Sequence, residues 1–212
     1  MRFQDRRDAG RQLAQRLMAY EGDPRVRVLA LPRGGVPVAY EVAVALRAPL
    51  DVFVVRKLGV PGQVELAMGA IATGGVRILN QQVIEGLGIP EDIVDTVTAN
   101  EQEELTRRER LYRGDNPPLE VRGLTAILID DGLATGSTMR AAVAAVRQQQ
   151  PAHLVVAVPV AAPSTHAEFQ TEMEKMVCVH TPQPFHAVGL WYETFSQTTD
   201  EEIKELLARA GE

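Results

Sequence analysis

Two adjacent acids followed by small hydroxyl residues stand out in the segment ILIDDGLATGSTM, residues 127–139. Asp130 and Asp131 follow an apolar stretch that is predicted to be a strand. Their carboxylates are therefore expected at the carboxyl edge of a sheet, where open α/β folds bind ligands. Consecutive strand residues point to opposite faces, so both acids reach one ligand only if the chain turns, and Gly132 permits that turn. The pair could then accept hydrogen bonds from vicinal hydroxyl groups.

The residues that follow, Thr135, Gly136, Ser137 and Thr138, coincide with the expected start of a helix. Free backbone N–H groups, the helix dipole and three hydroxyl groups meet there, which suits a phosphate dianion. An acid pair one loop away from a phosphate cradle matches a ribose 5-phosphate, with hydroxyls at one end and phosphate at the other. The alternative is an ordinary helix cap preceded by a turn.

Other phosphate-binding motifs fit this segment less well. A Walker A loop ends in Gly-Lys, and no lysine follows here. The dinucleotide fingerprint GxGxxG would follow the first strand, where the chain instead reads PRGGVPVA. A phosphatase with an aspartate nucleophile would carry acids at alternate positions, and Gly132 occupies the second of these.

The segment 127–138 resembles the signature of type I phosphoribosyltransferases, which is an apolar strand, two acids, a short loop and TGxT. The resemblance covers most of the chain in the order of its elements. It implies that Asp130 and Asp131 bind the ribose hydroxyls of phosphoribosyl pyrophosphate, directly or through Mg²⁺. It also implies that residues 134–138 hold the 5′-phosphate. The stretches RKLGVPGQVELAMGAIA and VGLWYETFSQTTDEEI are similar to a group of uncharacterised predicted phosphoribosyltransferases.

A second loop of interest contains Arg33, Gly34 and Gly35, after the first predicted strand. It resembles the family loop that meets pyrophosphate through backbone amides and a basic side chain. The alternative is an ordinary turn between a strand and a helix.

The basic pair Arg56 and Lys57 ends the second predicted strand and opens a polar connection, residues 56–65, that contains Gly and Pro and is expected to be mobile. In the family, residues at this position bind pyrophosphate, and the loop that follows them closes over the active site during the reaction. Solvated cations are the alternative. Glu65 lies in the same stretch and is a candidate acid or base, or a solvated loop charge.

The implied reaction breaks the bond between the anomeric carbon of ribose and pyrophosphate, and a nitrogen nucleophile takes the carbon. Magnesium and the three basic side chains Arg33, Arg56 and Lys57 would neutralise the leaving group, and the mobile loop would exclude water.

The acceptor is not named by these residues. Family members that use hypoxanthine or guanine carry an aspartate directly before TGxT, where this chain has Ala134, as adenine and uracil members do. Acceptor choice in the family belongs to a hood outside the sheet, expected here at about residues 181–199. Aromatic residues of that region could stack on a heterocycle or pack the core of the tail: Phe185, Trp191, Tyr192 and Phe195.

The elements that must position these residues follow from hydrophobic periodicity. Short apolar runs alternate with longer amphipathic stretches, which predicts an α/β fold: a doubly wound, mostly parallel sheet with helices on both faces. Residues 68–73 and 76–79 predict an antiparallel hairpin joined by Gly74 and Gly75. The predicted parallel strands are 26–31, 50–55, 124–129, 154–160 and 176–180, and the predicted helices are 5–20, 36–47, 90–113, 137–149, 163–173 and 200–210. Residues 1–212 are expected to form a single domain with a small C-terminal hood.

Composition narrows the class of protein. With 212 residues and 45% apolar residues, the chain can bury a substantial core. A net charge of −6 argues against a nucleic-acid-binding surface. The charged N-terminus and the short longest apolar run, 154–162, predict neither a signal peptide nor a membrane span, and hence a cytoplasmic protein. Cys178 is the single cysteine, and the four histidines lack the paired spacing of a metal site. A homodimer is compatible with these data.

Three hypotheses remain. The first is an enzyme that transfers phosphoribose from phosphoribosyl pyrophosphate to a nitrogenous base or amine, with Mg²⁺ as cofactor. The second is a regulatory protein that senses phosphoribosyl pyrophosphate or a nucleotide without turnover. The third is a salvage hydrolase or phosphatase that acts on the same ligand.

Overall fold

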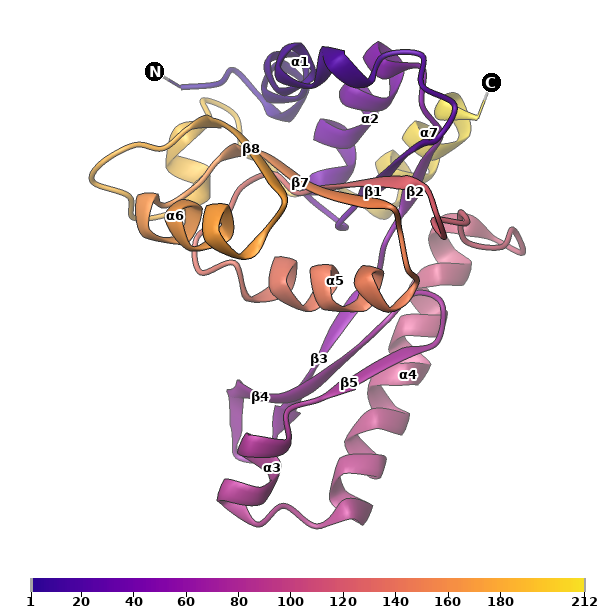
Figure 1. Cartoon of the computed structure of the whole chain (residues 1–212), viewed down its shortest axis with the longest axis vertical. Helices are drawn as coiled ribbons and strands as arrows, with labels where there is room; N and C mark the ends of the chain where they lie inside the picture. Colours follow the sequence, from indigo (N-terminus) through magenta and orange to yellow (C-terminus); the bar gives the residue numbers. More distant parts are fainter. Residues whose placement is uncertain (1, 212) are drawn as a thin grey trace.

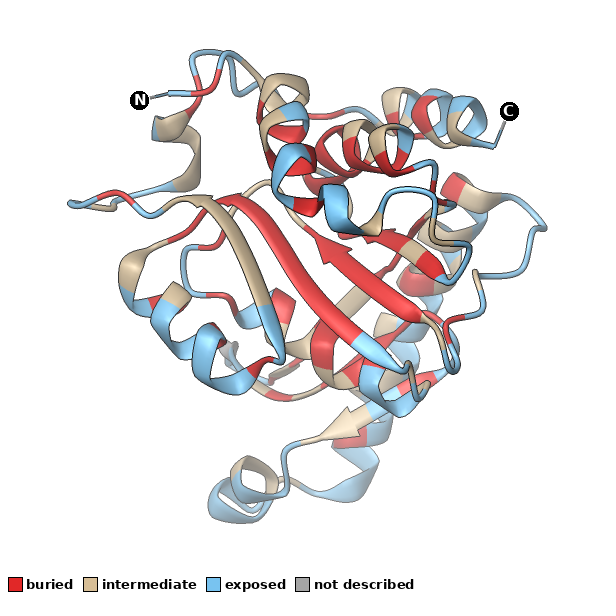
Figure 2. Ribbon diagram, turned by 45° about the horizontal axis from the view of Figure 1, so that its top comes forward, coloured by how far each residue is buried: buried red, intermediate tan, exposed pale blue. Residues whose placement is uncertain are grey.

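A five-stranded parallel sheet forms the centre of the protein. The computed structural model describes residues 2–211, with the side chains of residues 64 and 65 outside the described part. The strands follow the order β2-β1-β6-β7-β8 across the sheet. Their bounds are β1 Val26–Ala30, β2 Leu50–Val52, β6 Thr125–Ile129, β7 His153–Val160 and β8 Lys175–His180. The inner strands are almost wholly buried, as Figure 2 shows, which is typical of parallel strands covered on both faces.

Helices cover both faces of this sheet (Figure 1). Alternate strand residues join separate cores, so that Ile127 and Ile129 pack on one face and Leu128 on the other. The face of Ile127 and Ile129 is covered by α1 Arg6–Leu17, α2 Gly35–Leu46 and α7 Asp200–Ala210. The 3₁₀ turn η1 Met18–Tyr20 continues α1. The face of Leu128 is covered by α5 Ser137–Gln148 and α6 Pro163–Glu172. A further 3₁₀ turn, η2 Val188–Trp191, lies in the C-terminal segment.

The order of the strands creates a switch point between β1 and β6. From β1 the chain continues through α2 to β2 on one side, whereas from β6 it continues through α5 to β7 on the other. Crevices that bind ligands lie outside the carboxyl ends of strands at such a point. The two connections that leave this point are residues 31–34 and 130–136.

A second unit, residues 55–113, projects from the sheet, and we call it the arm (Figure 1). Three antiparallel strands in the order β3-β4-β5 form its sheet. The elements of the arm are β3 Val55–Val60, β4 Gln63–Ala72, β5 Val76–Leu79, α3 Gln81–Leu87 and α4 Glu91–Arg113. The helix α4 packs along β3 and β4 and ends beside β2, where Arg113 pairs with the buried Asp51. The arm is therefore continuous with the core of the sheet.

The predicted fold class is confirmed. The predicted hairpin corresponds to β4 and β5, and the predicted long charged helix corresponds to α4. Gly74 and Gly75 join β4 to β5 with φ values of +87° and +74°, in the left-handed region that glycine favours. The prediction of an irregular connection at 56–65 is wrong, because these residues form β3 and the beginning of β4. Leu58 and Val60 are buried against the core on alternate positions, but the charged pair before them, the intervening Gly59 and the Pro-Gly turn after them conceal this period in the sequence.

Two elements of the structure also differ from the prediction. The predicted strand 50–55 is divided between β2 and β3, which belong to different sheets, and α3 was not predicted. Within residues 2–211, none of the helices is both long and apolar enough to span a lipid bilayer.

Candidate functional site

Asp130 lies directly after β6 at the carboxyl edge of the sheet. Its Oδ1 accepts a hydrogen bond of 2.8 Å from the backbone N–H of Asp131. Burial, and after it the negative charge of Asp131, raise the pKa of Asp130 well above its ordinary value. The structure thus holds a carboxyl group that is costly to ionise, beside a second one.

Asp131 forms an ion pair with Arg6, at the first position of α1. The Arg6 Nε donates to Asp131 Oδ2 at 2.8 Å, and the two side chains are 12% and 15% exposed. Burial raises the pKa of Asp131, and the charge of Arg6 acts in the opposite direction. The guanidinium also donates to the carbonyl oxygen of Ser196 at 2.6 Å and lies 3.9 Å from the ring centroid of Phe195. Asp131 Oδ1 is the carboxylate oxygen that this ion pair leaves open.

Sequence reasoning missed Arg6, which is 125 positions from its partner. The N-cap Asp5 marks the start of α1 in the sequence, but no local pattern distinguishes Arg6 from the arginines beside it.

The loop from Ala134 to Thr138 lies at the N-terminus of α5. Its residues line a small pocket of about 170 Å³ together with Asp130 and Val188. Among the described residues, no hydrogen-bond acceptor is found for the backbone N–H groups of residues 134–137. Gly136, with a φ of +72°, precedes the first turn of α5 and has no capping side chain. Unpaired N–H groups and the positive end of the helix dipole are therefore found in the lining of the pocket, and such groups bind anions.

The loop between β1 and α2 packs directly on the two acids. A Cβ atom added at Gly34 would lie 2.0 Å from Asp131 Oδ2, and one at Gly35 would lie 3.0 Å from the Cα of Asp130. The structure therefore brings together the two loops that the sequence singled out, and glycine at both positions makes the approach possible. Arg33 is 41% exposed, with its Nη1 at 4.0 Å from Asp200 Oδ1 on α7.

The basic pair of β3 belongs to the arm. Arg56 forms an ion pair of 2.6 Å with Glu101 of α4, and Lys57 contributes to a cavity of about 490 Å³ between β3 and α4. In the described part of the chain, neither Arg56 nor Lys57 is hydrogen-bonded or ion-paired to the acids. The backbone of Glu65 is part of β4, and its side chain is outside the described part.

The aromatic residues of the C-terminal segment mainly pack. Tyr192 is 3% exposed, and its hydroxyl donates to the carbonyl oxygen of Asp131 at 2.5 Å. Burial raises the pKa of its phenol. Tyr192 could stack on a heterocycle or pack in the core of the tail, and the structure supports packing. The Trp191 ring is partly buried and meets His180 edge-on at 5.3 Å, and its buried Nε1 has no hydrogen-bond partner in residues 2–211.

The donor set suits a magnesium ion. Mg²⁺ is commonly held by one or two carboxylates together with substrate phosphates and water rather than by a full protein cage. Asp130 and the open oxygen of Asp131 provide such carboxylate ligands, and a cation would offset the unfavourable charge of the buried pair. Within residues 2–211 no group of three or more His, Cys, Asp or Glu side chains could hold a metal by itself. The two carboxylates therefore fit a metal that would take its remaining ligands from outside the protein, such as phosphate oxygens and water.

The chain is similar to known proteins in sequence and in fold. The family profile described as "Phosphoribosyl transferase domain" matches residues 62–188, more than half of the chain. A protein of Mycobacterium tuberculosis strain H37Rv, named provisionally as a phosphoribosyl transferase, is 48% identical over 208 residues, which are 98% of this chain and 47% of the relative. The chain thus spans about half the length of the curated relatives it matches.

A solved structure is similar over its whole length. The crystal structure of TT1426 from Thermus thermophilus is 40% identical in sequence and has a TM-score of 0.88, and the match covers 99% of both chains. The arm and the sheet are therefore shared by a protein whose structure was determined experimentally.

Proposed function

The chain belongs to the phosphoribosyl transferase family, and from this premise we propose that it transfers the 5-phosphoribosyl group of phosphoribosyl pyrophosphate to a nitrogenous base or amine. The observation that carries the proposal is the meeting of two features at the switch point of the sheet. One is the acid pair Asp130 and Asp131, and the other is the row of unpaired N–H groups at the start of α5.

The ribose 5-phosphate half of the donor accounts for these groups. We assign the 5′-phosphate to the amides of residues 134–137 and to the exposed hydroxyls of Thr135, Ser137 and Thr138. Asp130 would accept hydrogen bonds from the ribose hydroxyls or bind Mg²⁺, and Asp131 would contribute the oxygen that Arg6 leaves open. Magnesium, when bound with the substrate, would neutralise negative charge on the pyrophosphate group.

The pyrophosphate half would lie over the loop between β1 and α2. Gly34 and Gly35 keep the backbone of this loop close to the acids, and Arg33 is exposed beside it. Lys57 lines the cavity between β3 and α4, from which its flexible ammonium group would have to reach the leaving group. Arg56 would have to leave Glu101 to do so. The roles of Lys57, Arg56 and Glu65 stay predictions.

The C-terminal segment, about residues 181–199, is the hood in this proposal, on a single domain of residues 1–212. Val188 lines the phosphate pocket, and Tyr192 is anchored to the backbone of Asp131. This segment would thus form one wall of the acceptor site, with the exposed Phe195 as the aromatic surface that remains accessible.

Calorimetry with phosphoribosyl pyrophosphate and Mg²⁺ tests the donor assignment. Wild type is expected to bind, and the double variant Asp130→Asn, Asp131→Asn is expected to lose most of this affinity. Asp115→Asn is a suitable control, because the Asp115 side chain is exposed and forms no hydrogen bond or ion pair with any described residue. Absence of binding by wild type would refute the proposal.

The second candidate function is that of a sensor, which binds phosphoribosyl pyrophosphate without turnover. An assay with a panel of acceptors distinguishes this sensor from the transferase. Purines, pyrimidines and amines are offered with phosphoribosyl pyrophosphate, and release of pyrophosphate is measured. Release with any acceptor supports the transferase, whereas binding without release across the panel favours the sensor.

A further inference from the structure

Four consecutive carbonyl groups behind the phosphate pocket are each occupied by a hydrogen bond. The oxygen of Leu133 accepts from the N–H of Ala162 at 2.8 Å, and that of Gly136 accepts from the N–H of Arg140 at 2.9 Å. The two between them are bound by side chains. Thr165 Oγ1 donates to the oxygen of Ala134 at 2.5 Å, and Arg140 Nη1 donates to the oxygen of Thr135 at 2.8 Å.

These bonds determine where the N–H groups point. In a planar trans peptide the C=O and the N–H of the same unit point in opposite directions. The described cis peptides lie elsewhere, at residues 32–33 and 183–184. The carbonyls of residues 133–136 point toward their donors, which are the N–H of Ala162, the hydroxyl of Thr165, and the side chain and N–H of Arg140. The N–H groups of residues 134–137 therefore point away from these donors. Those are the N–H groups without a partner.

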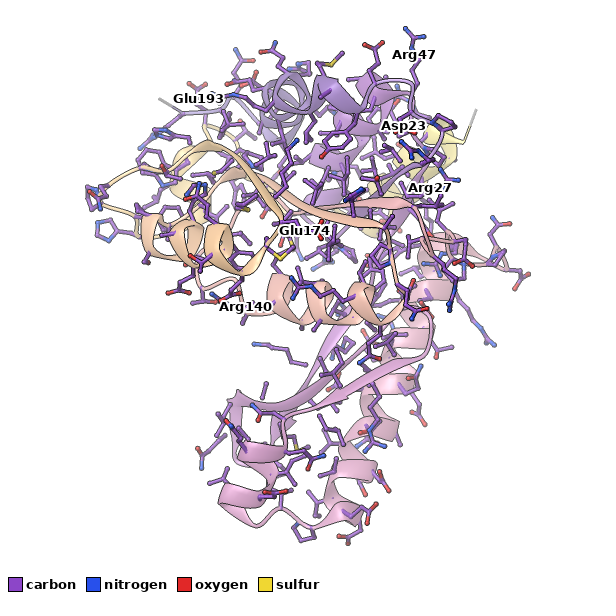
Figure 3. The ribbon with its side chains drawn as sticks, in the orientation of Figure 1. Asp23, Arg27, Arg47, Arg140, Glu174 and Glu193 are labelled. Atoms are coloured by element: carbon purple, nitrogen blue, oxygen red, sulfur yellow. The ribbon has the colours of Figure 1, made fainter. Side chains whose placement is uncertain are left out.

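Both side chains are themselves held in place. Thr165, on the first turn of α6, is 5% exposed, and its methyl carbon lies 3.0 Å from where a Cβ of Gly136 would be. Arg140 stands at the beginning of α5 on the side of α6, as Figure 3 shows, and its guanidinium lies over the Phe169 ring at 4.8 Å. It also forms ion pairs with Glu168 and Glu172.

We propose that Thr165 and Arg140 are positioning residues for the phosphate-binding loop. By holding two carbonyls on the far side, they orient the N–H groups toward the pocket before a ligand arrives. The loop then needs no rotation of its peptides when a phosphate monoester binds, so the affinity for that group is higher. The inference rests on the proposed function, because it assigns a role in binding the 5′-phosphate.

The test uses ribose 5-phosphate as the probe, in calorimetry on the full chain. Thr165→Val keeps the size of the side chain and removes the hydroxyl, whereas Thr165→Ser keeps the hydroxyl. We expect the valine variant to bind about tenfold more weakly and the serine variant to bind within about twofold of wild type, since one buried hydrogen bond is lost in the first case only. Arg140→Gln is expected to weaken binding as well.

The outcomes separate the inference from the proposed function. If wild type binds ribose 5-phosphate and the valine variant binds equally well, the positioning role is refuted and the proposed function stands. If wild type does not bind, the assignment of the phosphate site fails and the inference fails with it. If Thr165→Val does not fold, the affinities of Thr165→Ala and Thr165→Ser are compared instead. Rescue by serine supports the inference, because it shows that the hydroxyl itself is required.

Discussion

At the scale of single residues, the site contains a carboxyl group at a position where burial disfavours its ionised form. Asp130 is held between Asp131 and the glycines of the neighbouring loop, and its pKa is raised because the carboxylate is poorly solvated. A folded protein loses stability when such a group must ionise. The cost is consistent with a binding role, since a magnesium ion or ribose hydroxyls would compensate it.

We expect Asp130→Asn to stabilise the protein in the absence of ligand near neutral pH. The folded-state pKa of Asp130 lies above the unfolded value, so its contribution to stability is fully present below the unfolded pKa of about 3.9 and is lost as the pH rises through the folded pKa. Asparagine avoids this loss. The free energy of unfolding of Asp130→Asn should therefore exceed that of wild type most near neutral pH, and the two values should become equal toward about pH 4.

Urea denaturation across this pH range measures the effect, with the exposed Asp115→Asn as the control, which is expected to show no such gain. A variant that is less stable than wild type at neutral pH would contradict the argument.

Removal of Arg6 should have the opposite effect. Arg6→Gln leaves the partly buried Asp131 without its ion-pair partner, and we expect a loss of about 1–3 kcal/mol of stability at neutral pH. The loss should shrink in acid, because a protonated Asp131 no longer needs the guanidinium. Arg11→Gln on the same helix is the control: Arg11 is 55% exposed and its ion pairs are 3.9–4.0 Å long, so its loss should cost less than about 1 kcal/mol. Equal effects of the two variants would show that Asp131 does not depend on Arg6.

At the scale of elements, the site depends on how closely two loops approach. The β1–α2 loop can lie on the acids only because Gly34 and Gly35 have no side chains. At Gly34 the backbone angles, φ −59° and ψ −31°, are allowed for any residue, so the requirement for glycine comes from space and not from conformation.

We expect Gly34→Ala to destabilise the protein by about 1–3 kcal/mol and to weaken the binding of phosphoribosyl pyrophosphate, since the added methyl group displaces the carboxylate of Asp131. Gly86→Ala is the matched control, because a Cβ atom there meets nothing within 4 Å and Gly86 lies inside α3. That variant should be neutral or gain up to about 1 kcal/mol. Denaturation and calorimetry on both variants make the comparison, and a tolerated alanine at residue 34 would disprove the close packing of the loops.

At the scale of the whole molecule, α4 connects the arm to the sheet. Val94 and Leu105 of α4 belong to the same hydrophobic core as the strands of the sheet, and Arg113 at its end reaches β2. Arg113 Nε donates to both oxygens of Asp51 at 3.1 Å, and Asp51 also accepts from the N–H of Leu119 at 3.1 Å. This buried pair fixes the base of the arm.

Asp51→Ala is expected to cost about 3–5 kcal/mol, because it breaks a buried ion pair and leaves the guanidinium of Arg113 with only the 3.5 Å contact to Glu109 as a counter-charge. Asp95→Ala removes a second ion pair of the arm, between Arg77 and an Asp95 side chain that is 59% exposed, and should cost less than about 1 kcal/mol. Thermal or urea unfolding distinguishes the two. Similar values for both variants would mean that the buried pair contributes no more than a surface pair.

The features that the sequence determined by itself are local ones. The strand, the two acids and the TGST turn into α5 lie within the 14 residues 125–138, and their pattern of apolar, turn-forming and capping residues predicts both structure and ligand. The order of strands and helices follows in the same way, because each element shows its own period along the chain.

The tertiary structure alone decided which distant groups meet at the site. Arg6 on Asp131, Thr165 on the carbonyl of Ala134 and Glu101 on Arg56 join residues 125, 31 and 45 positions apart. These contacts depend on how whole helices pack against the sheet and the arm, and the burial of many side chains determines that packing. The period of one segment holds no information about its distant partner, so the sequence by itself could indicate the phosphate loop but not the side chains that orient it.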